Sequence, residues 1–258
     1  MPKHNRLIII MVFILIFLSP KISVSPIECR VSLESEYSDL VRIFEEFREL
    51  AQPKTRHGVP DYTATAMKTQ EQALETLRGQ LDALDIKEWP VSKQADYHIV
   101  RAELNGLQFY HRVLKPWTRN PGFYGTELIP GFPNRGDGVD VFMLEFPLKD
   151  DKISTFQKQL QAVPKLLEQA RKNLTDPARE LAIIAIRTKE KKILMFRDLI
   201  DRLNSHHPTL IPFAQQALEA VISYREWLIQ TKDDMTAPAG VGKENFNWWM
   251  KNDRPNLP

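Results

Sequence analysis

Residues 89–124, WPVSKQADYHIVRAELNGLQFYHRVLKPWTRNPGFY, carry the longest unbroken helical pattern of the chain. Pro90 suits the first position of a helix, because the backbone N–H that proline lacks is not needed there. Pro116 disfavours the α conformation at Lys115, so the two prolines predict a helix over 90–114. Two neighbouring apolar stripes run along it, one with Ile99, Gly106, Tyr110 and Val113 and the other with Val100, Leu104, Leu107, His111 and Leu114. A face that wide indicates a central helix packed against several neighbours.

Further segments on both sides of this stretch repeat apolar residues at helical spacing. They cover residues 33–51, 61–84, 150–174, 176–203 and 208–231. Pro164 predicts a kink or a break in the segment 150–174, because proline cannot donate the helical hydrogen bond. With the central helix, these segments predict an all-α fold of about six long amphipathic helices.

The residues between 116 and 138 form the irregular centre of the sequence. Trp117, Phe123, Tyr124 and Phe132 stand there among prolines and glycines. A long aromatic, Pro/Gly-rich loop inside a helical protein is either a lid and substrate wall or a well-packed connector. Both interpretations are open from the sequence alone.

The first 28 residues have the layout of a secretory signal. Lys3 and Arg6 precede an uninterrupted apolar run over 7–18. This run is shorter than the ~20 residues that comfortably span a bilayer, which favours a cleaved signal. An uncleaved anchor that keeps its positive end inside is the alternative, and it would bring residues 7–18 into the membrane. Either way we expect an exported protein, periplasmic or extracellular, with its helical domain over 29–258.

The composition narrows the classes of partner. The chain has 35 basic and 33 acidic residues, a formal net charge of +2. Such a balance argues against a dedicated nucleic-acid partner, which selects for a clustered basic surface. Cys29 is the single cysteine, so the chain cannot form an internal disulfide.

Several short motifs resemble the bacterial domain of unknown function family 885. They are Gly58-Val59-Pro60-Asp61-Tyr62, Trp89-Pro90-Val91, Asp96-Tyr97, Glu103-Leu104-Asn105-Gly106, Leu114-Lys115-Pro116-Trp117 and Asn120-Pro121-Gly122-Phe123-Tyr124, followed by residues 160–175 and 240–252. The resemblance covers most of the chain after residue 55. It implies an exported, all-helical, zincin-type protein, and zinc-dependent peptidase activity in complete members.

The zinc motif that such a peptidase needs is missing here. No histidine is followed by glutamate, and no two histidines have the four-residue helical spacing that places two imidazoles on one zinc ion. The resemblance therefore implies the N-terminal half of the family, truncated before any zinc motif. We expect no catalytic residue, no metal ligand and no cofactor in this chain, with zinc confined to full-length relatives.

The motifs nevertheless contain candidates for lining a substrate channel or for structural roles. They are Asp61, Tyr62, Glu103, Asn105, Trp117 and Tyr124. Glu103 either marks a functional interior, since a buried carboxylate needs a partner or a shifted pKa, or joins Asn105 in binding loop backbone. Asp61 is either a site residue or a turn and capping group.

Two functions of different classes fit these observations. The first is the substrate-channel half of a zinc-dependent peptidase, inactive alone, whose partner is a missing C-terminal half or a peptide-like ligand. The second is a self-sufficient extracytoplasmic helical module for binding or interaction. Metal-free catalysis by Asp61, Glu103 and Asp137 is a third possibility that no spacing in the sequence specifies.

Overall fold

The computed structural model describes residues 26–56, 58–125 and 145–252. The elements are α1 (Pro26–Leu50), β1 (Thr55–Arg56), β2 (Val59–Pro60), α2 (Ala64–Asp82), α3 (Val91–Phe109), η1 (Tyr110–Leu114), α4 (Pro116–Arg119), η2 (Pro121–Phe123), α5 (Asp150–Asn173), α6 (Arg179–His206), η4 (Pro208–Leu210), α7 (Ile211–Thr231), η5 (Lys232–Asp234) and α8 (Gly242–Asn252). Six of these helices have 19 to 28 residues, and β1 pairs only with β2 in the part described. The all-α prediction with about six long helices is confirmed.

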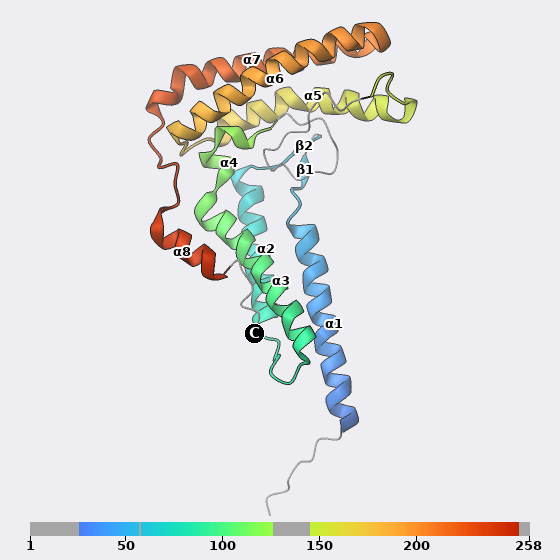
Figure 1. Ribbon diagram of the computed structural model, residues 1–258, viewed down its shortest axis with the longest axis vertical. Helices are drawn as coiled ribbons and strands as arrows, with labels where there is room; N and C mark the ends of the chain where they lie inside the picture. The colour runs from blue at the N-terminus through green and yellow to red at the C-terminus, as the bar shows by residue number, and fades with distance from the viewer. Residues whose placement is uncertain (1–25, 57, 126–144, 253–258) are drawn as a thin grey trace, which may run out of the picture.

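Helices α1, α2 and α3 run side by side and form what we call the lower bundle (Figure 1). Its core consists of Leu40, Ile43, Phe47, Leu74, Leu77, Leu81, Trp89, Tyr97, Val100 and Leu104. Polar bonds join the helices at their edges: the Tyr37 hydroxyl donates to Asp96 at 2.8 Å and Trp89 Nε1 donates to Glu36 at 3.1 Å. Large apolar side chains therefore hold the lower bundle together, and hydrogen bonds at its edge add to them.

Helices α5, α6 and α7 form a second layer, the upper bundle, which lies across the end of the lower one (Figure 1). Ala182 and Ala185 on α6 and Ala214 and Ala217 on α7 are completely buried. Small side chains at a contact let two helix backbones approach closely, so α6 and α7 pack along most of their lengths.

The residues after α3 connect the two bundles. The central helix is α-helical to Phe109 and continues as one π-helical turn, η1, to Leu114. Lys115 then adopts the left-handed conformation, with φ 40° and ψ 51°, and α4 begins at Pro116. The prediction that Pro116 would remove Lys115 from the right-handed helix is confirmed.

The described start of the central loop is a packed connector. Trp117, Phe123 and Tyr124 are buried in the core of the upper bundle. The Tyr224 hydroxyl donates to Pro121 O at 3.0 Å, and Lys189 Nζ donates to Tyr124 O at 2.7 Å. These bonds from α6 and α7 fix the connector between the bundles. The rest of the predicted loop, including Phe132, lies outside the described residues.

Some details differ from the predictions. Helix α5 passes through Pro164 without a break, and α1 begins at Pro26, earlier than expected. Helix α8, which was not predicted, packs on α3 with the rings of Trp248 and Phe109 stacked at 5.9 Å. The predicted signal or anchor falls mostly on residues 1–25, outside those described, and none of the described helices is long and apolar enough to cross a membrane.

Candidate ligand-binding cavity

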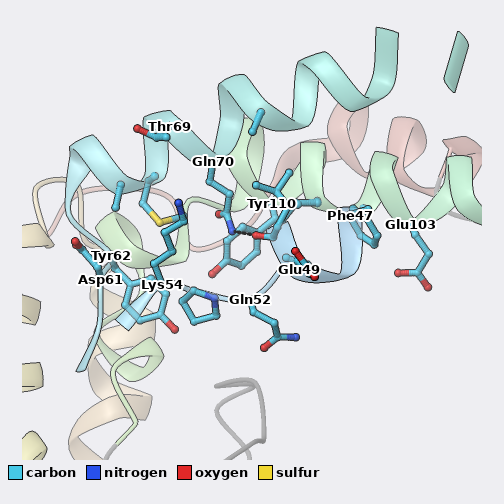
Figure 2. Close-up of a pocket in the computed structure, with 18 of the residues that line it drawn as sticks. Phe47, Glu49, Gln52, Lys54, Asp61, Tyr62, Thr69, Gln70, Glu103 and Tyr110 are labelled. Carbon is cyan, nitrogen blue, oxygen red and sulfur yellow. Dashed lines mark hydrogen bonds between the residues drawn. The ribbon is translucent and has the colours of Figure 1, made fainter. Parts of the chain in front are cut away.

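A cavity of about 700 Å³ lies where the two bundles meet (Figure 2). Its wall combines the end of α1 and the following loop with α2, α3, Tyr62 and Phe123. The lining residues are Phe47, Glu49, Leu50, Ala51, Gln52, Pro53, Lys54, Asp61, Tyr62, Ala66, Met67, Thr69, Gln70, Ala73, Ile99, Ala102, Glu103, Gly106, Leu107, Tyr110 and Phe123. The volume is within the range of about 300–1,000 Å³ that is usual for pockets holding small molecules.

Most of this wall is apolar, and one stripe of the central helix provides part of it. Ile99, Gly106 and Tyr110 line the cavity, and Ile99 is 46 % exposed. In the second stripe Leu114 is 40 % exposed. The prediction that both stripes pack against neighbouring helices is therefore wrong in part, because a binding surface and a core surface have the same apolar spacing.

Tyr110 lies at the junction of α3 and the π-helical turn. Its ring packs against Trp117 at 5.4 Å and Phe123 at 6.4 Å between centroids. Burial raises the pKa of the Tyr110 phenol well above its ordinary value, so the hydroxyl keeps its proton at neutral pH. Tyr110 thus brings one neutral hydrogen-bonding group to an apolar wall.

Gln70 links the cavity wall to a buried histidine. Its Nε2 donates to Leu50 O at 2.6 Å, and its Oε1 lies 2.8 Å from His111 Nε2. Because a carboxamide oxygen only accepts, His111 Nε2 carries the proton in this pair. Burial lowers the pKa of His111, an effect that the nearby charge of Glu71 partly opposes. Gln70 is therefore held in one orientation by α1 and by η1.

Helix α5 holds the wall segment around Tyr62 in place through hydrogen bonds from two side chains that lie one helical turn apart. Gln169 accepts from Tyr62 N at 2.7 Å and donates to Pro60 O at 3.1 Å, while Asn173 Nδ2 donates to Tyr62 O at 2.8 Å. The Tyr62 ring meets Phe123 edge-on at 4.7 Å. Backbone and side chain of this wall segment are thus set before any ligand enters.

Charged side chains lie around the apolar wall. Glu49, Lys54 and Glu103 are exposed, and Asp61 is half-buried. The Asp61 carboxylate accepts from Thr63 N at 3.0 Å, so Asp61 makes a turn and also lines the cavity. With three acidic groups and one basic group, the described lining residues carry a formal charge of −2.

The structure divides the predicted site residues into two groups. Asp61, Tyr62 and Glu103 line the cavity, whereas Asn105, Trp117 and Tyr124 do not. Asn105 Nδ2 donates to Asn252 O at 2.9 Å, so its partner is the last residue of helix α8 and not loop backbone as predicted. For Glu103 the expected bond to loop backbone is absent from the described residues.

Trp117 and Tyr124 support the wall from behind. Trp117 packs on Tyr110, and Tyr124 meets Tyr62 edge-on at 6.1 Å. The Tyr124 hydroxyl donates to Trp117 O at 2.6 Å and accepts from Asn173 Nδ2 at 3.0 Å. Both residues therefore position the aromatic rings that face the cavity.

Several lining residues were not recognised as site residues in the sequence. They include Phe47, Lys54, Gln70 and Tyr110. Gln70 carried a signal, because it is an amide within the otherwise apolar stripe of α2. The segment over 47–54 carried no signal of a site, since its place in the cavity wall depends on long-range packing.

The described residues hold no group of three or more His, Cys, Asp or Glu side chains close enough to bind a metal ion. Among the described lining residues there is also no Ser, Cys or His. The arrangement is suited to holding a ligand by shape and apolar contact.

Comparison with known proteins defines the fold and no more. No family model matches the sequence, and no curated protein matches it. A solved structure with a similar fold is "a putative lipoprotein of unknown function" from Shewanella oneidensis, with a TM-score of 0.55 and 16 % sequence identity. The match covers 83 % of this chain and 40 % of that one, so this chain spans less than half the length of its structural neighbour.

Proposed function

We propose that this chain is an extracytoplasmic binding module that holds a largely apolar molecule in the cavity at the end of its lower bundle. The observation that carries the proposal is the cavity of about 700 Å³ with a mainly apolar wall. An apolar surface of this kind gains free energy when it is covered, at about 25 cal/mol per Å² removed from water.

The construction of the wall supports binding. Gln70 is held by two hydrogen bonds, and Gln169 and Asn173 hold the segment of Tyr62 by three more. A wall that is already ordered loses little conformational entropy when a ligand enters. The cavity thus has the preformed character of a small-molecule site.

The cellular location belongs to the same proposal. The charged and then apolar layout of the N-terminus is that of a protein sent across a membrane. A structural neighbour described as a lipoprotein agrees with a place in the cell envelope. The ligand would then be a molecule met outside the cytoplasm.

A saturation experiment tests the binding proposal. The uncharged fluorophore N-phenyl-1-naphthylamine should bind the purified chain at one site, with a rise in fluorescence. Ala73→Leu places extra carbon atoms in the cavity and should weaken binding at least tenfold, on the order of 1.4 kcal/mol.

Ala83→Leu is the matched control, because Ala83 is exposed at the end of α2 and does not line the cavity. Circular dichroism establishes that both variants are folded. Absence of saturable binding to the wild-type chain, or equal binding by folded Ala73→Leu, would overturn the proposal.

A second candidate function is the one implied by the motif resemblance: the substrate-channel half of a zinc-dependent peptidase. It is supported by the presence of Asp61, Tyr62 and Glu103 in the cavity wall, since these were candidates for a substrate channel. In that case the cavity would hold part of a peptide and a further protein half would supply the zinc.

The second candidate predicts that the purified chain alone has neither stoichiometric zinc nor chelator-sensitive peptidase activity. Elemental analysis and a peptide-cleavage assay with and without chelator measure the two properties. Finding both in this chain would contradict the assignment of catalysis to a missing half.

A further inference from the structure

We propose that the molecule bound in this cavity carries a cationic, alkylammonium-like end. The inference rests on the proposed binding function and adds the chemical class of the ligand. Two independent features of the lining point to it: carboxylates that form no ion pair with another described residue, and a set of aromatic rings.

The carboxylates come from separate elements. Glu49 is on the last turn of α1, Asp61 precedes α2, and Glu103 is on α3. Figure 2 shows Asp61 and Glu103 toward opposite ends of the cavity, with Glu49 between them. A ligand lying along the cavity therefore has a carboxylate near it in more than one position.

These three carboxylates form no ion pair with any described residue, whereas other acids of this chain do. Glu46 pairs with Arg42 at 2.8 Å, and Glu168 pairs with Lys172 at 2.6 Å. Among the described lining residues Lys54 is the single basic one, and it forms no ion pair with another described residue. The excess negative charge at the cavity is thus uncompensated within the described structure.

Aromatic rings form the second feature. Phe47, Tyr62, Tyr110 and Phe123 all contribute to the lining. The negative face of an aromatic ring attracts an ammonium group, and aromatic cages are a recurrent way to bind quaternary ammonium ligands. Rings and carboxylates together favour a cation and disfavour a carboxylate, sulfate or phosphate head of equal size.

The size of the preference follows from the exposure of the charges. Exposed ion pairs contribute roughly 0.2–1 kcal/mol, which corresponds to about a 1.4- to 5-fold change in affinity for each carboxylate. An anion experiences the same interaction with opposite sign. On equal apolar tails we expect the cation to bind about tenfold more tightly than the anion at low salt.

Competition with the bound fluorophore measures this ratio. The probes are decyltrimethylammonium, decanol and decyl sulfate, each used below the concentration at which it aggregates. The ammonium should displace N-phenyl-1-naphthylamine at the lowest concentration and the sulfate at the highest. If the sulfate competes as well as the ammonium, the charge preference is wrong while the binding function stands. If the fluorophore itself does not bind, the binding function fails first.

Single substitutions test whether the preference for a cationic ligand arises from the charged residues of the cavity. Glu49→Gln should reduce the ratio of ammonium to sulfate affinity about two- to fivefold, and Lys54→Met should raise it. Glu45→Gln is the matched control, because Glu45 is exposed on the same helix and does not line the cavity. An unchanged ratio in Glu49→Gln, Asp61→Asn and Glu103→Gln together would overturn the proposal.

Discussion

The two bundles are built from helices of similar length, yet they differ in the size of their cores and in the side chains that pack between their helices. In the described residues the core cluster of the upper bundle contains 26 buried residues and that of the lower bundle 10, so the upper one is the larger core. Fully buried alanines bring α6 and α7 together, whereas large side chains hold the helices of the lower bundle apart. The cavity lies beside the smaller core, which indicates that one bundle provides the scaffold and the other the binding surface.

The largest expected effect comes from removing one leucine from each core. Leu203 and Leu74 are both 0 % exposed, and replacing a buried leucine by alanine costs about 2–5 kcal/mol. Leu203→Ala should lie near the upper end of this range, because the tightly packed upper core cannot relax into the gap. Leu74→Ala should lie near the lower end, because α2 borders the cavity and has room to move.

Denaturant unfolding followed by circular dichroism gives the two free energies of unfolding. Hydrogen exchange then locates the loss of protection in one bundle or the other. Equal costs, or a larger cost for Leu74→Ala, would contradict the distinction between a closed scaffold and an open binding bundle.

A smaller effect is expected at the junction. Asn173→Ala removes donors to Tyr62 O and to the Tyr124 hydroxyl, which lie at 2.8 and 3.0 Å. Leaving such partly buried acceptors without a donor costs about 1–3 kcal/mol. Because Tyr62 is in the cavity wall, the variant should also bind N-phenyl-1-naphthylamine less tightly.

Thermal melts and fluorescence titration check both expectations for Asn173→Ala. Asn204→Ala is the matched control, since Asn204 is exposed on α6. If Asn173→Ala loses stability but keeps full ligand affinity, the upper bundle does not position the cavity wall.

The smallest expected effect is a pH dependence of the free energy of unfolding that arises from His111, the hydrogen-bond partner of Gln70. Burial lowers the pKa of His111 below its ordinary 6.5, so the unfolded chain binds a proton there more readily than the folded one. The free energy of unfolding should therefore fall as the pH drops below about 6.5, and level off below the folded pKa.

His111→Gln keeps a donor for Gln70 and should reduce this pH dependence. His98→Gln, on the same central helix and half-buried, is the control. Urea unfolding between about pH 5 and pH 7.5 measures the slope. An identical slope in wild type and His111→Gln would show that acid sensitivity arises elsewhere.

Local signals in the sequence predicted the helices well. The prolines at 90 and 116 placed the limits of the central helix, and apolar spacing identified the long helices of both bundles. These signals act between neighbouring residues, so they need no knowledge of the rest of the fold. Asp61, Tyr62 and Glu103, which the motifs made candidates for lining a channel or for structural roles, lie in the cavity wall.

The site itself depended on contacts between distant residues. Periodicity marks a side chain as apolar, but it does not say whether that side chain meets another helix or an open cavity. Ile99 and Tyr110 had the pattern of core residues and line the cavity, whereas Trp117 and Tyr124 had the pattern of a loop and are buried.

By itself the sequence determined the helical class, the limits of the central helix and the balance of charge, because these follow from local conformation and composition. Tertiary structure alone decided that Gln70 of α2 bonds the end of α1, that Gln169 and Asn173 of α5 hold Tyr62, and that a space of about 700 Å³ is left at the end of the lower bundle. The reason is that a cavity is the volume that packing leaves unfilled, and packing joins residues more than a hundred positions apart.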